Sequence, residues 1–213
     1  MRLGLKQLIA AAGALAAAGA AFAQSPVAPT EVTIDKLALT NIPAITNAKL
    51  TVRSPAFKNM NDIPFENTQF RADTFPGLIW SRGPAGTKSY SVIMQDTDVK
   101  LADGSEILHW TMYNIPAKVT SLPAGMTDPV AGSAYGPNIR AAVSAYLGPK
   151  PRAGPAHRYH FQVFALDTTI VDAPANYAAL AAAMKGHVVA SGQIIGLGVL
   201  DPTYTPPPAP AAK

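Results

Sequence analysis

Residues 89–96 read Ser-Tyr-Ser-Val-Ile-Met-Gln-Asp, and this stretch decides the fold. Val92, Met94 and Asp96 share one face of the predicted strand, because successive side chains of a strand point to opposite sides. The other face carries the alternate residues Ser91, Ile93 and Gln95. If the face of Val92 points inward, the carboxylate of Asp96 enters apolar surroundings, where it needs hydrogen-bond donors or an opposite charge.

Apolar runs bounded by turn residues and prolines predict further strands, and their number indicates a mainly-β single domain. The clear candidates are residues 107–115, 158–166 and 187–195, and weaker ones are residues 48–52 and 78–80. One Ala- and Leu-rich helix is predicted over residues 175–185, with Pro174 in its first turn and Asp172 just before it. Gly186 is expected to end that helix.

The composition fits one folded domain of ordinary size. The chain has 213 residues, of which 48% are hydrophobic and 14% are charged. A chain of this length buries roughly 70% of its unfolded surface, so it needs no metal or disulfide to hold a core. Because it has no cysteine, thiol catalysis, cysteine-ligated zinc and disulfides are excluded.

The first 23 residues have the pattern of a cleavable secretory signal. Arg2 and Lys6 precede an apolar stretch over residues 8–22, and Ala21-Phe22-Ala23 forms a cleavage site before Gln24. An uncleaved membrane anchor is the alternative interpretation. The apolar stretch is shorter than the roughly 18 residues of a membrane span, so we expect export to the periplasm with cleavage after Ala23.

Three further segments are expected after the signal. Residues 24–47 form an N-terminal linker and first strand, residues 48–200 form the main domain, and residues 201–213 form a solvated tail rich in Pro and Ala. The formal charge is +4, and removal of the two basic residues of the signal leaves about +2. With no cluster of Lys and Arg between aromatic residues, we expect no nucleic-acid partner.

The chemistry-bearing residues are polar side chains on apolar strands. Nucleophile-elbow, zincin, Walker A and dinucleotide-binding motifs are absent, and nothing marks a serine as a nucleophile. Asp96, His109 and His157 remain as candidate site residues. As alternatives, Asp96 could cap the turn at the end of its strand, and each histidine could be a hydrogen-bonded core or surface residue. His157 shares its strand face with Tyr159, whereas His160 faces the other way, so the two histidines are not expected to hold one ligand.

Four short motifs, in this order, carry a resemblance to a known family: Asp96-Thr97-Asp98, His109-Trp110, Gly148-Pro149-Lys150 and His157-Arg158-Tyr159. Together they resemble the phosphatidylethanolamine-binding protein family, in its bacterial branch, which is also called Raf-kinase-inhibitor-like. The resemblance covers roughly residues 48–200. It implies a β-sandwich with a large central sheet, a smaller sheet and one or two helices in the C-terminal half. It also implies a small anion-binding pocket at one end.

The resemblance assigns residues to that pocket. The ligand-binding residues it implies are Asp96, His109, Gly148, His157 and Tyr159. Residues of structural importance nearby are Asp98, Trp110, Pro149 and Arg158. Thr97 and Lys100 replace prolines of the family motif, which puts its rigid turn in doubt. Lys150 stands where bacterial relatives often have cysteine, and it either adds positive charge at the pocket rim or lies solvated in a loop.

Such a pocket suits a small anion. Imidazoles, a tyrosine hydroxyl and a loop N–H group donate to phosphate or carboxylate, while Asp96 orients a histidine or binds an ammonium group. Phosphoethanolamine offers both charges. Each charge-assisted hydrogen bond contributes about 1.5–3 kcal/mol, so a head group alone is expected to bind at roughly millimolar concentration. We therefore hypothesise a non-enzymatic periplasmic protein that binds small anions or phospholipid head groups without a metal or cofactor.

Two other functions stay open. The protein could inhibit or regulate a partner, such as a periplasmic hydrolase, because eukaryotic members of the family bind other proteins. It could instead be a hydrolase in which one Asp and two His form a metal site or an acid–base pair. Bacterial relatives also suggest a homodimer.

Overall fold

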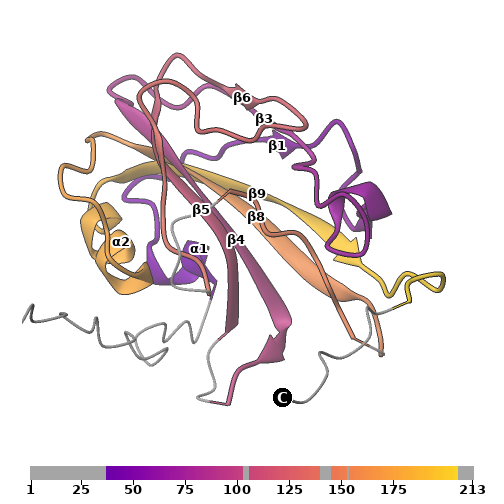
Figure 1. The fold of residues 1–213 in the computed structure, drawn as a ribbon. Helices are drawn as coiled ribbons and strands as arrows, with labels where there is room; N and C mark the ends of the chain where they lie inside the picture. Colours follow the sequence, from indigo (N-terminus) through magenta and orange to yellow (C-terminus); the bar gives the residue numbers. More distant parts are fainter. Residues whose placement is uncertain (1–36, 103–105, 140–144, 153, 206–213) are drawn as a thin grey trace, which may run out of the picture.

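The computed structural model describes residues 37–102, 106–139, 145–152 and 154–205. The described part contains two β-sheets and two short α-helices (Figure 1). In order across the large sheet, the strands are β2 (Asn61–Asp62), β9 (Val188–Gly198), β8 (His157–Leu166), β4 (Ser89–Lys100), β5 (Glu106–Pro116) and β7 (Ala134–Tyr135). The small sheet contains β1 (Val52–Arg53), β3 (Leu78–Trp80) and β6 (Ser121–Leu122). This arrangement confirms the expected mainly-β fold with a large and a small sheet.

Strand β4 lies inside the large sheet, between β5 and β8, and pairs with both in antiparallel fashion. Val92 and Met94 point into the core between the two sheets, where they join Trp80 of β3. Ile93 points to the opposite face. A strand buried on both sides needs apolar residues at successive positions, and the alternation read from residues 89–96 is therefore confirmed.

Helices cover the face of the large sheet that lies away from the small sheet (Figure 1). Helix α2 (Tyr177–Met184) packs Leu180 and Met184 into a cluster with Ile93 and Phe164. Its cap differs from the expected one: the Asn176 side chain, rather than Asp172, accepts a hydrogen bond from the Ala179 N–H at 2.8 Å. The helix is shorter than the predicted 175–185, because its first turn begins only after this cap.

Helix α1 (Ala38–Asn41) lies in the described part of residues 24–47, the segment for which a linker and first strand were expected. Two buried glutamines of the large sheet hold it. The Ala38 N–H donates to Gln95 Oε1 at 2.8 Å, and the Leu39 N–H donates to Gln162 Oε1 at 2.9 Å. These amides satisfy N–H groups that the short helix cannot satisfy itself. The signal over residues 1–23 and most of the tail lie outside the described residues.

Strands β4 and β9 run further than predicted. Residues 97–100 continue β4 as far as a pairing of Lys100 with Glu106, where a polar loop was expected. Thr97 and Lys100, which replace family prolines, fit this extension because a proline would remove an N–H group from the ladder. Strand β9 continues to Gly198 because it pairs with the whole length of β8, up to His157.

A close backbone approach at Gly192 of β9 gives a test of the fold. A Cβ atom there would overlap the carbonyl oxygen of Leu50, whose N–H donates to Ser191 O at 2.9 Å. We expect Gly192→Ala to lower the free energy of unfolding by about 2–3 kcal/mol, because backbone must move to admit the methyl group. Gly86→Ala is the control, since Gly86 has open space and only a positive φ of 89°, which costs about 1 kcal/mol. Equal losses in urea denaturation would contradict this packing.

Candidate functional site

A bulge in β5 turns His109 toward the face of the sheet that carries Asp96. Met94 pairs with Trp110, but the next residue of β4, Gln95, pairs with Leu108. His109 is therefore the extra residue, and it lies on the same side as Trp110 instead of the opposite side. Bulges redirect side chains in this way beside functional sites.

Asp96 and His157 form a buried ion pair at the end of the sheet. His157 Nδ1 lies 2.9 Å from Asp96 Oδ2, and the exposed fractions of the two side chains are 12% and 2%. Because a carboxylate only accepts, Nδ1 of His157 carries a proton, and Nε2 is the nitrogen left for another partner. The Asp98 N–H donates to the other carboxylate oxygen, Oδ1, at 2.9 Å.

Tyr159 lies between the two imidazoles. Its ring centroid is 5.0 Å from that of His109, in an edge-on arrangement, and 6.4 Å from that of His157, nearly parallel. Burial raises the pKa of Tyr159, and the charge of Asp96 and a hydrogen bond to it raise that pKa further. The phenol therefore keeps its proton and serves Asp96 as a third donor.

His109 is held in one tautomer. Its Nδ1 lies 3.0 Å from the carbonyl oxygen of Leu147, so this nitrogen carries the proton. Burial lowers the pKa of His109, against the opposing effects of the Asp96 charge and of the Leu147 and Gly148 carbonyls. The Nε2 atom is buried and has no hydrogen-bond partner among the residues that the structure describes. A neutral imidazole in this tautomer presents Nε2 as an acceptor.

Asp98 and Arg158 brace the pair from outside. The guanidinium Nη2 of Arg158 lies 2.6 Å from Asp98 Oδ1, and the Arg158 N–H donates to Asp98 Oδ2 at 2.6 Å. Arg158 lowers the pKa of the Asp98 carboxyl through these hydrogen bonds and its charge. Both residues join β4 to β8, and neither lines the cavity described below.

Gly148 has a different place from the one expected. Its N–H donates to Asp73 Oδ1 at 2.8 Å, so this group is used inside the protein, and Gly148 does not line the cavity. A Cβ atom at Gly148 would overlap Asp73 Oδ1 and the Asn67 carbonyl oxygen. Gly148 thus permits a close approach between two loops.

Residues 67–73 clamp the loop of Gly148. The Tyr146 hydroxyl donates to Asn67 O at 2.9 Å, Gln69 Nε2 donates to Gly148 O at 2.6 Å, and the Gln69 N–H donates to Pro149 O at 3.0 Å. Together with the Asp73 contact, these bonds fix the loop whose Leu147 carbonyl sets the tautomer of His109.

A cavity of about 340 Å³ brings most of the predicted residues together. It is lined by Gln69, Asp96, Val99, Ile107, His109, Ile139, Leu147, Lys150, Pro151, Arg152, His157 and Tyr159. Four of the five predicted ligand-binding residues are present. Gln69 and Arg152 were missed, because Gln69 lies in a loop without a motif and Arg152 lies two residues beyond the Gly148-Pro149-Lys150 motif. Lys150 stands at the wall, with Nζ 5.1 Å from the ring centre of Tyr204.

Trp110 and Pro149 support the site from outside it. Trp110 is fully buried in the core between the sheets, with its ring centroid 5.0 Å from that of Phe75. Pro149 accepts the Gln69 N–H and lies beside Gly198, where a Cβ atom would approach it. His160 lies on the opposite face of β8, where its Nδ1 is 2.9 Å from Gln193 Oε1. The expected separation of His160 from His157 is therefore confirmed.

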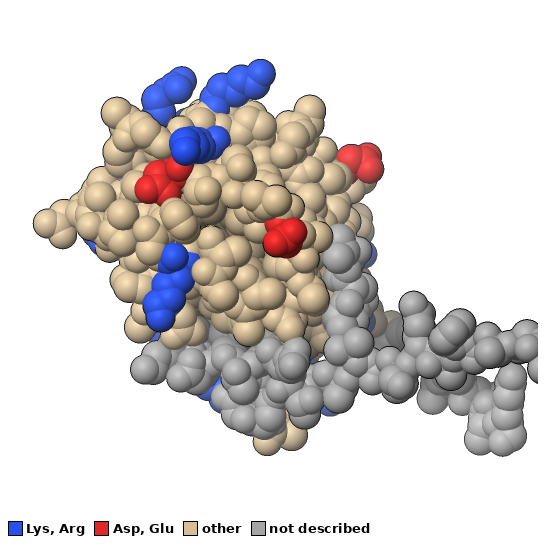
Figure 2. Space-filling view, turned by 90° about the vertical axis from the view of Figure 1, so that its left-hand side faces the viewer, with Lys and Arg blue, Asp and Glu red and all other residues tan. Residues whose placement is uncertain are grey.

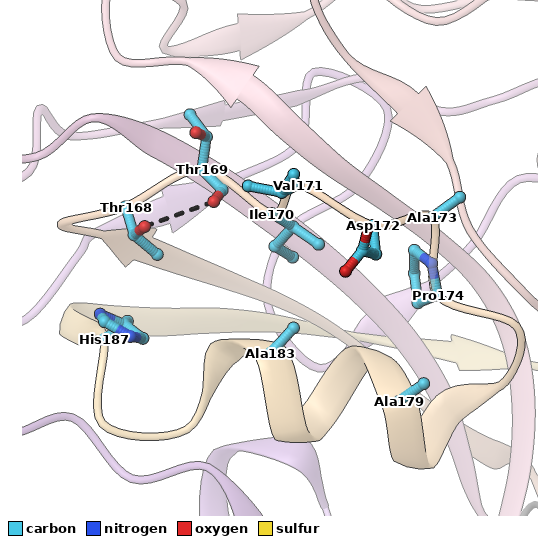
Figure 3. A pocket seen from close by; sticks show the side chains of 10 residues that line it. All are labelled: Thr168, Thr169, Ile170, Val171, Asp172, Ala173, Pro174, Ala179, Ala183 and His187. Carbon is cyan, nitrogen blue, oxygen red and sulfur yellow. Dashed lines mark hydrogen bonds between the residues drawn. The ribbon is translucent and has the colours of Figure 1, made fainter.

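A second cavity, of about 350 Å³, lies between residues 168–174 and α2 (Figure 3). Its histidine, His187, has Nδ1 2.8 Å from Asp167 Oδ1, but the two side chains are 49% and 41% exposed. Water competes for an exposed pair of this kind. The pair of Asp96 and His157 is far more buried, so we take its cavity as the candidate site.

The described surface and helices add three observations. On the face shown in Figure 2, Lys and Arg side chains gather at the upper left next to an acidic group, and other acidic groups stand apart from them. None of the helices in the described ranges is long and apolar enough to cross a membrane. Within those same ranges, no three His, Cys, Asp or Glu side chains are grouped so that they could hold a metal ion.

The buried His109 predicts a pH dependence of stability. Its folded pKa lies below the ordinary 6.5, so between these two values the unfolded chain binds more protons than the folded one. The free energy of unfolding should therefore fall as pH drops below about 6.5. His109→Gln should flatten this part of the profile, measured by urea denaturation at several pH values. A slope that the substitution leaves unchanged would contradict the assignment.

Known proteins resemble the chain in sequence and in fold. The family model for phosphatidylethanolamine-binding protein matches residues 53–198. A UPF0098 protein of Methanothermobacter thermautotrophicus is 32% identical over 152 residues, which cover 70% of this chain and 97% of the relative. LppC of Mycobacterium tuberculosis, whose name describes it as a lipoprotein, is 29% identical over 199 residues and covers 93% of both chains.

Solved structures agree with this assignment. YbcL of Escherichia coli, described as a member of the mammalian family, superposes with a TM-score of 0.64 at 29% identity, covering 72% of this chain and 100% of its own. CT736 of Chlamydia trachomatis superposes with a TM-score of 0.66 at 28% identity, covering 73% and 100%. The motifs, the two-sheet fold and these matches together show that the chain belongs to the phosphatidylethanolamine-binding protein family.

Proposed function

We propose that this protein binds small anionic or phosphorylated groups, of the phosphoethanolamine type, in the cavity beside Asp96 and His157, and that it does so without catalysing a reaction. The observation that carries this proposal is the buried pair itself. The Asp96 carboxylate accepts from Nδ1 of His157 and fixes the ring, which leaves Nε2 as the nitrogen for a ligand. With an oxyanion bound, Nε2–H of His157 donates a charge-assisted hydrogen bond to it.

The charges around the cavity favour an anion further. Lys150 and Arg152 belong to its wall. Asp96 is almost fully buried and receives the His157, Tyr159 and Asp98 donors, so its own charge is screened from a ligand. The net effect at the opening is positive.

The size of the cavity indicates a head group rather than a whole lipid. Ligand pockets span about 300–1,000 Å³, and 340 Å³ lies at the lower end of this range. Two or three charge-assisted hydrogen bonds, less the cost of immobilising the ligand, correspond to roughly millimolar binding. Val99, Ile107 and Leu147 give part of the lining an apolar surface, but a cavity of this size has room for only a short apolar group beside the head group.

We further propose that the protein acts in the periplasm. The signal-like pattern of residues 1–23 supports export. The similarity to LppC, which is named as a lipoprotein, agrees with a place outside the cytoplasm.

Replacement of His157 tests the site. We expect His157→Ala to weaken the binding of phosphoethanolamine at least about tenfold, because one charge-assisted hydrogen bond is lost. Isothermal titration calorimetry measures this. His187→Ala is the matched control, since His187 also pairs with an aspartate, but in the second cavity. Binding that is absent in the unmodified protein, or equal in both variants, would refute the proposal.

Replacement of Lys150 tests the rim. We expect Lys150→Ala to weaken binding about threefold at low salt. The effect is small because the Lys150 charge is exposed, and water and salt ions screen its attraction for the anion. High salt should remove most of the difference between the variant and the unmodified protein. A loss that persists at high salt would instead mean that Lys150 contacts the ligand directly and carries more of the affinity than we propose.

A further inference from the structure

His109 lines the cavity, and its Nε2 atom is a buried acceptor without a hydrogen-bond partner among the described residues. The side chain is 6% exposed, and its proton is committed on Nδ1 to the Leu147 carbonyl at 3.0 Å. A buried acceptor without a donor is costly, so a ligand that brings a donor gains more than one that brings only acceptors.

We propose that the cavity selects oxyanions that carry a proton: His109 Nε2 accepts a hydrogen bond from a P–OH group of a phosphate monoester or inorganic phosphate, which sulfate cannot supply. This inference rests on the proposed function, because it concerns the same site. The pocket thus binds both the charged oxygens and the hydroxyl group of a monoprotonated phosphate. His157 donates to its charged oxygens, and His109 accepts from its hydroxyl.

Among the titratable and charged groups that line the cavity, none replaces His109 as acceptor; the Gln69 amide also belongs to the lining, with its Nε2 donating to the Gly148 carbonyl. On β4, Asp96 already accepts from three donors. On β8, His157 and Tyr159 are donors toward Asp96, and on the loop Lys150 and Arg152 are cations. A sulfate oxygen placed near Nε2 would meet a lone pair and find no hydrogen to share.

The tautomer of His109 resists inversion. To donate from Nε2, the neutral ring would have to give up its bond to the Leu147 carbonyl, and the loop that carries this carbonyl is clamped through Gln69 and Asp73. Protonation would make Nε2 a donor, but burial lowers the pKa of His109 and so opposes protonation of the ring. Above the ordinary histidine pKa of about 6.5, Nε2 therefore stays an acceptor.

The pH dependence of selectivity follows from the ligand. The second ionisation of a phosphate monoester has a pKa of about 6, so its P–OH group disappears as pH rises. A change in the protein that acts on the anion's charge alone would affect the binding of phosphate and sulfate alike. The ratio of the two affinities therefore isolates the contribution of the ligand proton.

The experiment measures the affinities of the full chain for methyl phosphate, inorganic phosphate and sulfate by calorimetry between pH 6 and pH 8. We expect both phosphates to bind about tenfold more tightly than sulfate at the acidic end. Toward the alkaline end the ratio should decline for methyl phosphate, which loses its P–OH group, and persist for inorganic phosphate, whose dianion keeps one. Methyl phosphate and dimethyl phosphate, which carry the same single charge below the second ionisation, provide a second pair. Only the first has a P–OH group, and we expect it to bind more tightly.

The variant His109→Gln assigns the effect, because an amide can donate as well as accept. It should bring the affinities of phosphate and sulfate to within about threefold of each other. His160→Gln is the matched control, since His160 is equally buried, at 6% exposed, but lies on the other face of the sheet. That variant should keep the selectivity of the unmodified protein.

The outcomes separate the two proposals. Equal affinity for phosphate and sulfate in the unmodified protein overturns the selection of protonated oxyanions and leaves the proposed function standing. No binding of either anion, or of phosphoethanolamine, overturns both. A selectivity that survives in folded His109→Gln overturns the role of His109. The pH series on the unmodified protein needs no variant, so it decides the question even if that variant does not fold.

Discussion

The contact between Asp96 and His157 is the constraint on which the rest of the site depends. A carboxylate with 2% exposure needs donors, and its donors come from a neighbouring strand and from its own strand two residues later. This requirement fixes the register of β4 against β8, where Asp96 lies opposite Tyr159, and the ion pair of Asp98 with Arg158 keeps it. The buried Asp96 carboxylate thereby fixes the pairing of β4 with β8 and the positions of the His157 and Tyr159 rings, which line the cavity.

Much of this framework could be predicted from the sequence, because it depends on alternation along single strands. The faces of Val92 and Met94 on β4, and the separation of His157 from His160 on β8, follow from the period of two. The order of the four motifs was enough to suggest the family and hence the pocket. These features are local, or they are carried by motifs of adjacent residues.

The remaining features arise from contacts between distant segments. Simple alternation along β5 predicts that His109 and Trp110 point to opposite faces of the sheet. Only the pairing of β5 with β4 reveals the bulge that puts the two side chains on the same face. The N–H of Gly148 finds its partner in Asp73, 75 residues earlier in the chain. Helix α1 forms where the Gln95 and Gln162 side chains accept hydrogen bonds from its N–H groups. Such outcomes depend on which segments meet, and no local pattern carries that information.

The segment after β9 packs against the wall of the cavity. Asp201 pairs with Arg71 at 2.8 Å, the ring of Tyr204 lies 5.0 Å from that of Phe70, and Lys150 stands over Tyr204. The polypeptide therefore leaves the described fold beside the mouth of the pocket. The segment after β9 thus supports the wall of the site, and truncation of the chain before Tyr204 would remove the ring over which the Lys150 ammonium group lies.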